Sequence, residues 1–361
     1  MATPKWQSDL LEQYNKGGIT AEEYFAAAEQ HKIQEILGPL EAKTHDAYEQ
    51  AAMEMQQKVD RRLANYQKKK AEMQLLVDKG ELSEDAFRNW KWRQLAANQD
   101  LRDLAETLAE DMHNYNLIAA GIARDAMPDV YALSANYAMY GIDMQGWALG
   151  SGKIGASFTL YNHDTAEILL KEEQKSLLPA PSAKKLKELK QLKKTNPDVL
   201  WNTQKMQSAI LQGVLQGESS LAIAERLKTV GQMDERQAIR NARTMTTNVQ
   251  NMGHQRAYLN AKELGIDLEI EWYAILDGNT RDSHRRMHGE RKKNTKTAKF
   301  SNGCRWPGDP QGPAGEVYNC RCTTVSWVKG FESEVQKSGS WLAQNGMTFD
   351  EWQKGKKKAT G

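Results

Sequence analysis

The chain has 361 residues, of which 40% are hydrophobic and 27% charged, so it is long enough for two or three domains but polar for one compact globule. Ten tryptophans and twelve tyrosines argue against a disordered chain. The net charge of +2 excludes a global field that would draw the protein onto nucleic acid, so any DNA contact requires a local basic patch.

The N-terminal sequence runs directly into polar helical sequence and lacks the apolar core of a signal peptide. No stretch approaches the roughly 18 apolar residues that a membrane-spanning helix needs. We therefore expect no membrane contact and a cytosol-like, reducing compartment. The three cysteines, Cys304, Cys320 and Cys322, lie in one short C-terminal region, and in such a compartment this clustering favours metal ligation over disulfides.

The first 115 residues predict a long helical hairpin. The stretch from Leu40 to Asp78 contains neither glycine nor proline and is rich in residues that lose little rotamer freedom in a helix. Gly80 suits the position just after a helix, and Ser83 suits the N-cap of the next. An earlier pair, Thr20 and Glu23, has the spacing of a capping box.

Residues 116–264 predict a mixed, mostly helical middle region, interrupted by a linker near residues 177–197. Two prolines within 177–181 break the helical pattern there. A cluster of six lysines follows the two prolines: Lys184, Lys185, Lys187, Lys190, Lys193 and Lys194. These six could neutralise DNA phosphates without reading sequence, or they could form an ordinary solvated helix face.

Residues 265–330 change in composition and predict a small α+β domain. The run from Leu268 to Ile275 starts with the alternation of a half-buried strand, and Cys320 to Trp327 alternates again. Between them, residues 277–319 are typical of a long loop. Residues 331–361 are expected to form a basic, mobile tail. The predicted fold is thus mainly α, with an N-terminal helical hairpin and a loop-rich C-terminal domain containing a few antiparallel strands.

Two motifs frame the long loop. The first runs from Leu276 to His284 (Leu-Asp-Gly-Asn-Thr-Arg-Asp-Ser-His) and is followed by Met-His-Gly at 287–289, and the second is Asn-Cys-Arg-Cys at 319–322. In order and spacing these motifs resemble the C-terminal domain of the phage Mu protein F-like family, also called phage head morphogenesis or minor head proteins. An Ala-rich, Arg-Thr-containing segment at 238–253 resembles the helix preceding that domain.

The resemblance implies that the motif residues fix the C-terminal domain. They are Asp277, Thr280, Arg281, His284, Gly289, Asn319, Cys320, Arg321 and Cys322. The sequence also departs from the family. Many relatives carry Cys-x-x-Cys where this chain has Arg281 and His284, and a histidine where it has Val317. The full metal site of those relatives is therefore in doubt here.

A zinc site could still be drawn from five side chains in this region: His284, His288, Cys304, Cys320 and Cys322. Cysteines two apart in a strand share a face, and metal–ligand bonds could replace the core that a loop-rich segment lacks. The alternative is that the cysteines pack as small buried residues while the histidines bond loop carbonyls.

The resemblance implies a minor head protein rather than an enzyme. Such a protein would join the procapsid in the host bacterial cytoplasm, remain in the virion, and contact the portal, other head or scaffold components and genomic double-stranded DNA. Two alternatives remain. His284, Asp277 and Arg281 could serve a metal-dependent nuclease carried in the head, or the lysines could make a sequence-independent DNA-binding protein. We expect no catalytic residues.

Overall fold

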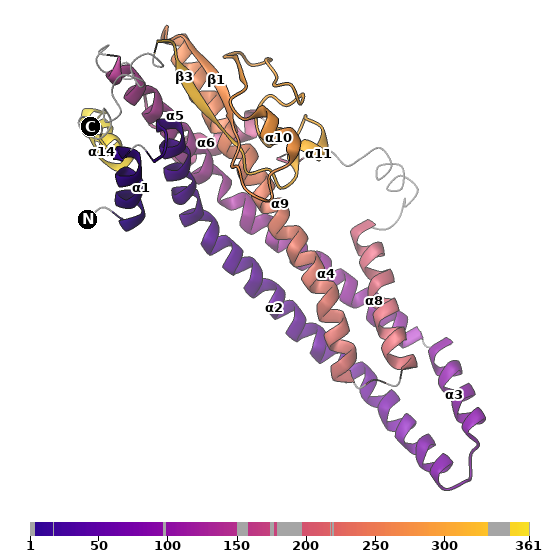
Figure 1. Cartoon of the computed structure of the whole chain (residues 1–361). Helices are drawn as coiled ribbons and strands as arrows, with labels where there is room; N and C mark the ends of the chain where they lie inside the picture. The colour runs from indigo at the N-terminus through magenta and orange to yellow at the C-terminus, as the bar shows by residue number, and fades with distance from the viewer. Residues whose placement is uncertain are drawn as a thin grey trace. The chain divides into compact units, whose positions relative to one another are not determined.

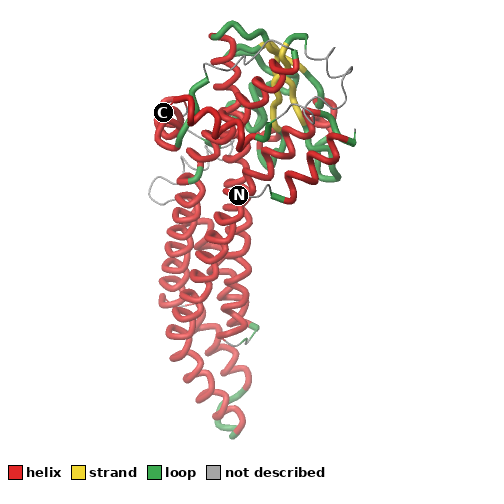
Figure 2. The backbone as a smooth tube through the Cα atoms, turned by 90° about the vertical axis from the view of Figure 1, so that its left-hand side faces the viewer, coloured by secondary structure: helices red, strands yellow, loops and turns green. Residues whose placement is uncertain are grey.

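The structure is a computed structural model, and it describes residues 4–16, 18–96, 99–149, 158–173, 177–178, 197–216, 218, 220–330 and 347–360 (Figure 1). Most of these residues are helical, and the three strands among them form one small antiparallel sheet (Figure 2). The predicted fold class is therefore confirmed.

The chain divides into two compact units that interleave along the sequence. The helical unit comprises Glu41–Ile122 and Pro181–Ile239, and the sheet-bearing unit comprises Met1–Leu40, Ala123–Ala180 and Arg240–Gly361. Three long helices contribute to both units: α2 (Ala21–Asp78), α4 (Gln99–Asp125) and α9 (Ser220–Glu263). The domain boundaries expected near residues 115, 264 and 330 stay a prediction.

The helical unit contains the predicted hairpin. The chain passes along α2 and then returns in the opposite direction through α3 (Glu84–Ala96) and α4. Helix α8 (Pro197–Leu215) and the first part of α9 complete the bundle. Tyr48 of α2 hydrogen-bonds Asn116 of α4, whereas Lys58 pairs with Asp111, so the two helices are antiparallel. Their shared core is built from large apolar side chains with almost no exposed surface: Val59, Leu63, Leu104, Leu108, Met112, Ile223 and Leu227.

The helix ends follow the predicted local chemistry. Gly80 has a φ of +74°, a conformation that glycine adopts without strain, and the next amide, of Glu81, donates to the Leu76 carbonyl at 2.9 Å. The Ser83 hydroxyl accepts a hydrogen bond from the Ala86 amide at 3.1 Å, as an N-cap should. Thr20 and Glu23 cap each other reciprocally at 2.7 and 3.2 Å.

The sheet-bearing unit holds strands β1 (Leu268–Tyr273), β2 (Arg291–Lys293) and β3 (Thr323–Val328), in the order β2-β1-β3. In the central strand, Ile270 faces Lys292 on one side and Ser326 on the other. The unit's other helices are α1 (Lys5–Asn15), α5 (Met127–Ala148), α6 (His163–Glu173), α10 (Asp282–Met287), α11 (Ala314–Val317) and α14 (Phe349–Thr360).

Side chains of α5 and α9 cover the free edge of β3. Gln145 of α5 donates to the Ser326 carbonyl and accepts from the Val328 amide, both at 2.8 Å. The Tyr258 hydroxyl of α9 donates to the Thr324 carbonyl at 3.0 Å. These bonds satisfy backbone groups that an exposed edge strand would leave open. They also tie β3, and the cysteines that precede it, to two long helices.

The basic C-terminal segment, for which we expected mobility, instead contains a packed helix. Phe349 and Trp352 of α14 are 2% and 4% exposed, and the Trp352 indole donates to Asp143 of α5 at 2.8 Å. Lys32 of α2 pairs with Asp350 at 2.9 Å. The lysine-rich composition led us to expect mobility, but burial of the Phe349 and Trp352 side chains outweighs the entropy cost of ordering the helix.

No helix among the described residues is long and apolar enough to cross a membrane. The six lysines from Lys184 to Lys194 lie outside the described residues, so their surroundings stay a prediction.

Candidate metal centre

The turn after β1 is built around the Asp277 carboxylate. Its Oδ1 accepts the Asn279 amide at 2.9 Å and lies 3.0 Å from the Thr280 hydroxyl, a local arrangement that aspartate favours in turns. Arg321 binds both carboxylate oxygens at 2.6 Å. The turn is thereby joined to the residue between the two cysteines, and the two predicted motifs meet in space.

This pairing changes the acidity of Asp277. The Arg321 guanidinium, followed by the Asn279 amide, holds the pKa of the Asp277 carboxyl well below its ordinary value. A carboxylate with a depressed folded-state pKa stabilises the fold above its unfolded pKa of about 3.9, and that stability is lost as the pH falls further.

We therefore expect Asp277→Asn to lower the melting temperature at pH 7 and to match the native protein more closely as the pH falls below about 4. Thermal melts of chelator-treated protein from pH 7 to pH 3 would measure the difference. Asp267→Asn is the control, because Asp267 is 76% exposed and only loosely paired with Lys329, at 3.6 Å. A pH-independent difference would contradict the assignment.

The other motif residues complete the scaffold. Arg281 donates to the Tyr318 carbonyl, which draws the start of α10 toward the cysteine motif. Gly289 has a φ of +83°, and its amide donates to the Trp272 carbonyl at 2.9 Å, where α10 returns to β1. Asn319 has a φ of 56°, which asparagine tolerates better than most residues, and its amide donates to the Thr244 hydroxyl of α9.

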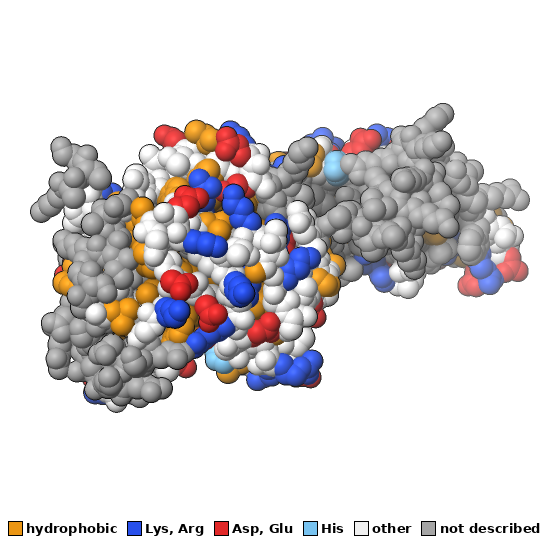
Figure 3. Space-filling model, turned by 90° about the horizontal axis from the view of Figure 1, so that it is seen from above, with side chains coloured by type: hydrophobic (Ala, Val, Ile, Leu, Met, Phe, Trp, Pro, Cys, Tyr) orange, Lys and Arg blue, Asp and Glu red, His pale blue; other side chains and the backbone are white. Residues whose placement is uncertain are grey.

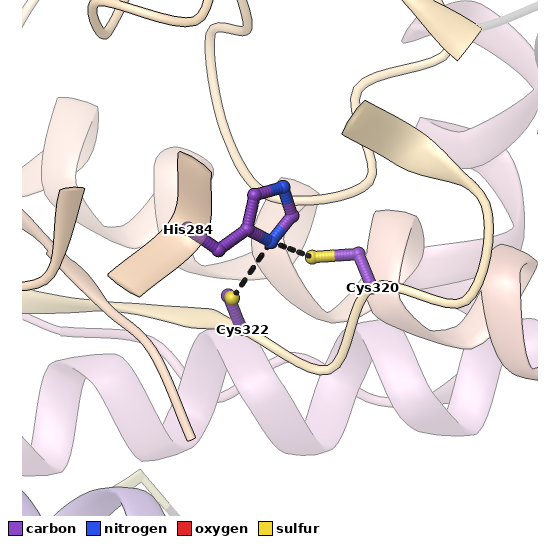
Figure 4. Close-up of side chains that lie close together, drawn as sticks. All are labelled: His284, Cys320 and Cys322. Carbon is purple, nitrogen blue, oxygen red and sulfur yellow. Dashed lines mark hydrogen bonds between the residues drawn. The ribbon is translucent and has the colours of Figure 1, made fainter. Parts of the chain in front are cut away.

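Three of the five candidate ligands converge at one point. The imidazole of His284 directs Nδ1 between the two sulfurs, 3.3 Å from Cys322 Sγ and 3.7 Å from Cys320 Sγ (Figure 4). All three side chains are buried, and their ligand atoms lie within 4.8 Å of one another. We call His284, Cys320 and Cys322 the triad.

The triad has the dimensions of a metal site. Tetrahedral zinc, with Zn–S bonds of about 2.3 Å and a Zn–N bond of about 2.0 Å, holds a nitrogen and a sulfur ligand about 3.6 Å apart. The two nitrogen–sulfur distances, 3.3 and 3.7 Å, bracket that value. Two thiolates and an imidazole are also a donor set that zinc prefers, so the residues present fit the ion.

The protein environment already favours one thiolate. Hydrogen bonding from Cys320, with a further contribution from His284, lowers the pKa of Cys322, although burial opposes the shift. Burial raises the pKa of Cys320 well above its ordinary value. A dication at this point would remove the second proton, because a coordinating thiol is deprotonated.

The far side of the imidazole faces Glu316 of α11. His284 Nε2 lies 3.0 Å from Glu316 Oε2, although their orientation falls outside hydrogen-bonding geometry. The Ser283 hydroxyl donates to the same carboxylate oxygen at 3.0 Å. The 3.0 Å separation places the Glu316 carboxylate directly beside this ring nitrogen. A carboxylate in this position fixes the ring and raises its basicity as a ligand.

Replacing Glu316 by glutamine should therefore weaken metal binding by about tenfold, the lower end of the range for such partners. Competition against a chromophoric chelator would measure the affinity. Glu290→Gln is the matched control, since Glu290 accepts hydrogen bonds from Ser301 rather than approaching the triad. Equal affinities for the two variants would show that Glu316 does not position His284.

The remaining two candidate ligands lie apart from the triad. Cys304 is fully buried beside Gly312, and burial raises its pKa to about 12, so it behaves as a small packed thiol. His288 accepts the Ala274 amide through Nδ1 at 3.2 Å and packs its ring on Tyr273. The burial of Cys304 is consistent with the packing alternative, whereas His288 accepts a backbone amide instead of bonding a loop carbonyl. Metal ligation by either side chain stays a prediction.

Several residues that support the triad gave no sequence signal. Trp272, with no exposed surface, packs edge-to-face on His284 with ring centroids 5.3 Å apart. The Thr247 hydroxyl of α9 donates to the Cys320 carbonyl at 2.7 Å. Together with Glu316, they belong to three different elements. Only the tertiary fold brings them to one place, and no spacing rule in the sequence could have grouped them.

The family model described as "Phage Mu protein F like protein" matches residues 204–325. That range includes most of α8, all of α9 and the triad. No solved structure matches the chain.

Three curated relatives were found. An NAD(+)--arginine ADP-ribosyltransferase EFV of Enterococcus faecalis is 31% identical over 56% of this chain and 39% of its own length. Minor head protein GP7 of Bacillus phage SPP1 is 29% identical over 41% of this chain and 50% of its own. An uncharacterised protein of Haemophilus influenzae is 27% identical over 37% of this chain and 27% of its own. The chain thus spans half or less of each relative's length. The family match confirms the resemblance of the two motifs: residues 204–325 are similar to the phage Mu protein F-like family.

Proposed function

We propose that this protein is a minor head protein of a tailed bacteriophage that acts in head morphogenesis. The observation that carries the proposal is the family match over residues 204–325, which contains both motifs and the packed triad. The similarity to a protein named as a phage minor head protein supports it. The protein would be made in the host cytoplasm and kept in the virion.

The direct test is the composition of purified phage heads. An antibody against the full chain should detect the protein in procapsids and mature heads, at the same ratio to major capsid protein after repeated gradient purification. Loss of the protein from heads during purification would contradict the proposal. We further propose the portal vertex as the contact site. Heads assembled without portal protein should then lack the chain, whereas equal incorporation would contradict portal binding.

DNA contact is a separate part of the proposal, and it rests on the six lysines from Lys184 to Lys194. On the face that Figure 3 shows, basic side chains lie among acidic ones, so the described residues there form no field of one sign. Because each lysine could neutralise one phosphate, replacing all six lysines by glutamine should remove most of the salt dependence of DNA binding, measured as affinity against salt concentration. An unchanged salt slope would contradict this role.

We do not assign a catalytic role to the polar residues of the loop. Asp277 is held by Arg321, Arg281 by the Tyr318 carbonyl, and Glu290 by Ser301. These contacts support the reading that such residues fix a long loop, in preference to the nuclease alternative. The activity named for the Enterococcus relative is that protein's own, and this chain covers 39% of it.

For the triad, the proposed role is structural. A zinc ion bound by His284, Cys320 and Cys322 would link α10 to the start of β3 by metal–ligand bonds. Such bonds contribute directly to folding free energy where a loop-rich segment buries little apolar surface. The proposal rests on the donor set and its spacing.

A further inference from the structure

The triad supplies three ligands, whereas structural zinc sites are almost always four-coordinate. All three cysteines and all seven histidines of the chain lie among the described residues, and within that set only His284, Cys320 and Cys322 come together. Arg281 borders the triad but cannot serve as a ligand, because a guanidinium has no lone pair to donate. The described protein therefore leaves one coordination position without a ligand.

A small hollow adjoins the triad on one side. It measures about 10 Å³, and all three triad residues line it, together with Asn279, Arg281 and Asn319. A space of this size holds about one water-sized molecule. The lining offers amide and guanidinium groups, which can donate hydrogen bonds to whatever enters. Zinc sites that keep an exchangeable fourth ligand have the same arrangement, with three protein ligands and an open fourth position.

The charged side chains that line the hollow, Arg281 and Arg321, are both basic, which favours an anion there. The Glu316 carboxylate approaches the opposite side of the His284 ring and does not line the hollow. Both arginines line the hollow together with the two sulfurs. Arg321 is already paired with Asp277, whereas Arg281 donates to the Tyr318 carbonyl and forms no ion pair within the described part of the chain.

We propose that the metal ion held by the triad accepts one small monovalent anion as its fourth ligand, through this hollow, and that Arg281 stabilises the anion. The inference rests on the proposed zinc site and is independent of the role in head assembly. The proposed centre differs from a closed structural zinc site with four protein ligands, because its fourth ligand exchanges with solution.

Cobalt(II) substitution of the full chain provides the test, since its visible absorption reports the ligand set. Adding chloride to a chloride-free buffer should shift the cobalt bands in a saturable way, with one anion per ion, and chloride is close in size to the water-sized hollow. Arg281→Gln should weaken chloride binding about tenfold while cobalt stays bound. Arg286→Gln, on the exposed face of α10, should leave chloride binding unchanged.

A second variant fills the position from the protein side. Arg281→Cys places a thiol on the lining of the hollow, and it should strengthen the sulfur-to-cobalt charge-transfer band and abolish the chloride response. Bound cobalt whose spectrum does not respond to chloride in the native chain would overturn the anion site while leaving the triad intact. Failure of the native chain to bind cobalt or zinc would overturn the metal site itself, and would not affect the proposed head role.

Discussion

Cys322→Ser should lower the melting temperature of the sheet-bearing unit by about 10 °C when zinc is present. A ligand that binds only the folded state at about a thousand times its Kd stabilises it by about 4 kcal/mol, and each kcal/mol is worth about 2–4 °C in a unit of this size. Serine is a poor zinc ligand, so the variant should lose this contribution. Melting followed by calorimetry, with and without chelator, would measure it.

Cys304→Ser is the matched control for that experiment. Cys304 is as buried as Cys322 but lies outside the triad, so its replacement should alter packing without altering metal binding. Chelator should therefore lower the melting temperature of the native chain and of Cys304→Ser, and leave that of Cys322→Ser unchanged. A chelator effect that persists in Cys322→Ser would show that the ion, if any, binds elsewhere.

Gly253→Ala should destabilise the sheet-bearing unit by about 2–3 kcal/mol, the usual cost of forcing extra volume into a packed core. A methyl group at this position of α9 would lie 2.7 Å from the Tyr131 carbonyl oxygen and 3.0 Å from the Ala135 nitrogen. Both are backbone atoms of α5, so neither can move without displacing the helix. The two helices that cover β3 would be forced apart, and denaturant unfolding would record the loss.

Gly121→Ala is the control for this prediction. Gly121 lies within α4, and an added methyl group would meet nothing within 4 Å. Alanine has the higher helix propensity by about 1 kcal/mol, so this variant should be slightly more stable than the native chain. If Gly253→Ala proved as stable as Gly121→Ala, the close approach of α9 and α5 at Gly253 would be contradicted.

Local chemistry made much of the fold predictable. The capping pair Thr20 and Glu23, the turn at Gly80 and the N-cap Ser83 are all found where short sequence patterns placed them. Strand β1 was predictable from alternation. Strand β2 was not, because its three charged residues carry no apolar signal. It pairs with β1 through the backbone ladder and through the Arg291–Glu271 ion pair, and both form only in the folded protein.

The candidate site was only partly accessible from sequence. The ordered motifs singled out His284, Cys320 and Cys322, but could not separate them from His288 and Cys304, which are equally suitable by residue type. Their separation is decided by the direction in which each side chain leaves the backbone. For the same reason Glu316 and Trp272 were missed, since their contacts with His284 exist only once α10, α11 and β1 are packed.

If the triad holds one metal ion, elemental analysis of the purified full chain detects it most directly. The chain should carry about one zinc per molecule after dialysis against metal-free buffer, and Cys322→Ser should carry almost none while Cys304→Ser keeps its zinc. A native chain that is folded and free of metal, and that takes up no zinc or cobalt when these are supplied, would contradict the account. The triad would then be a cluster of packed side chains.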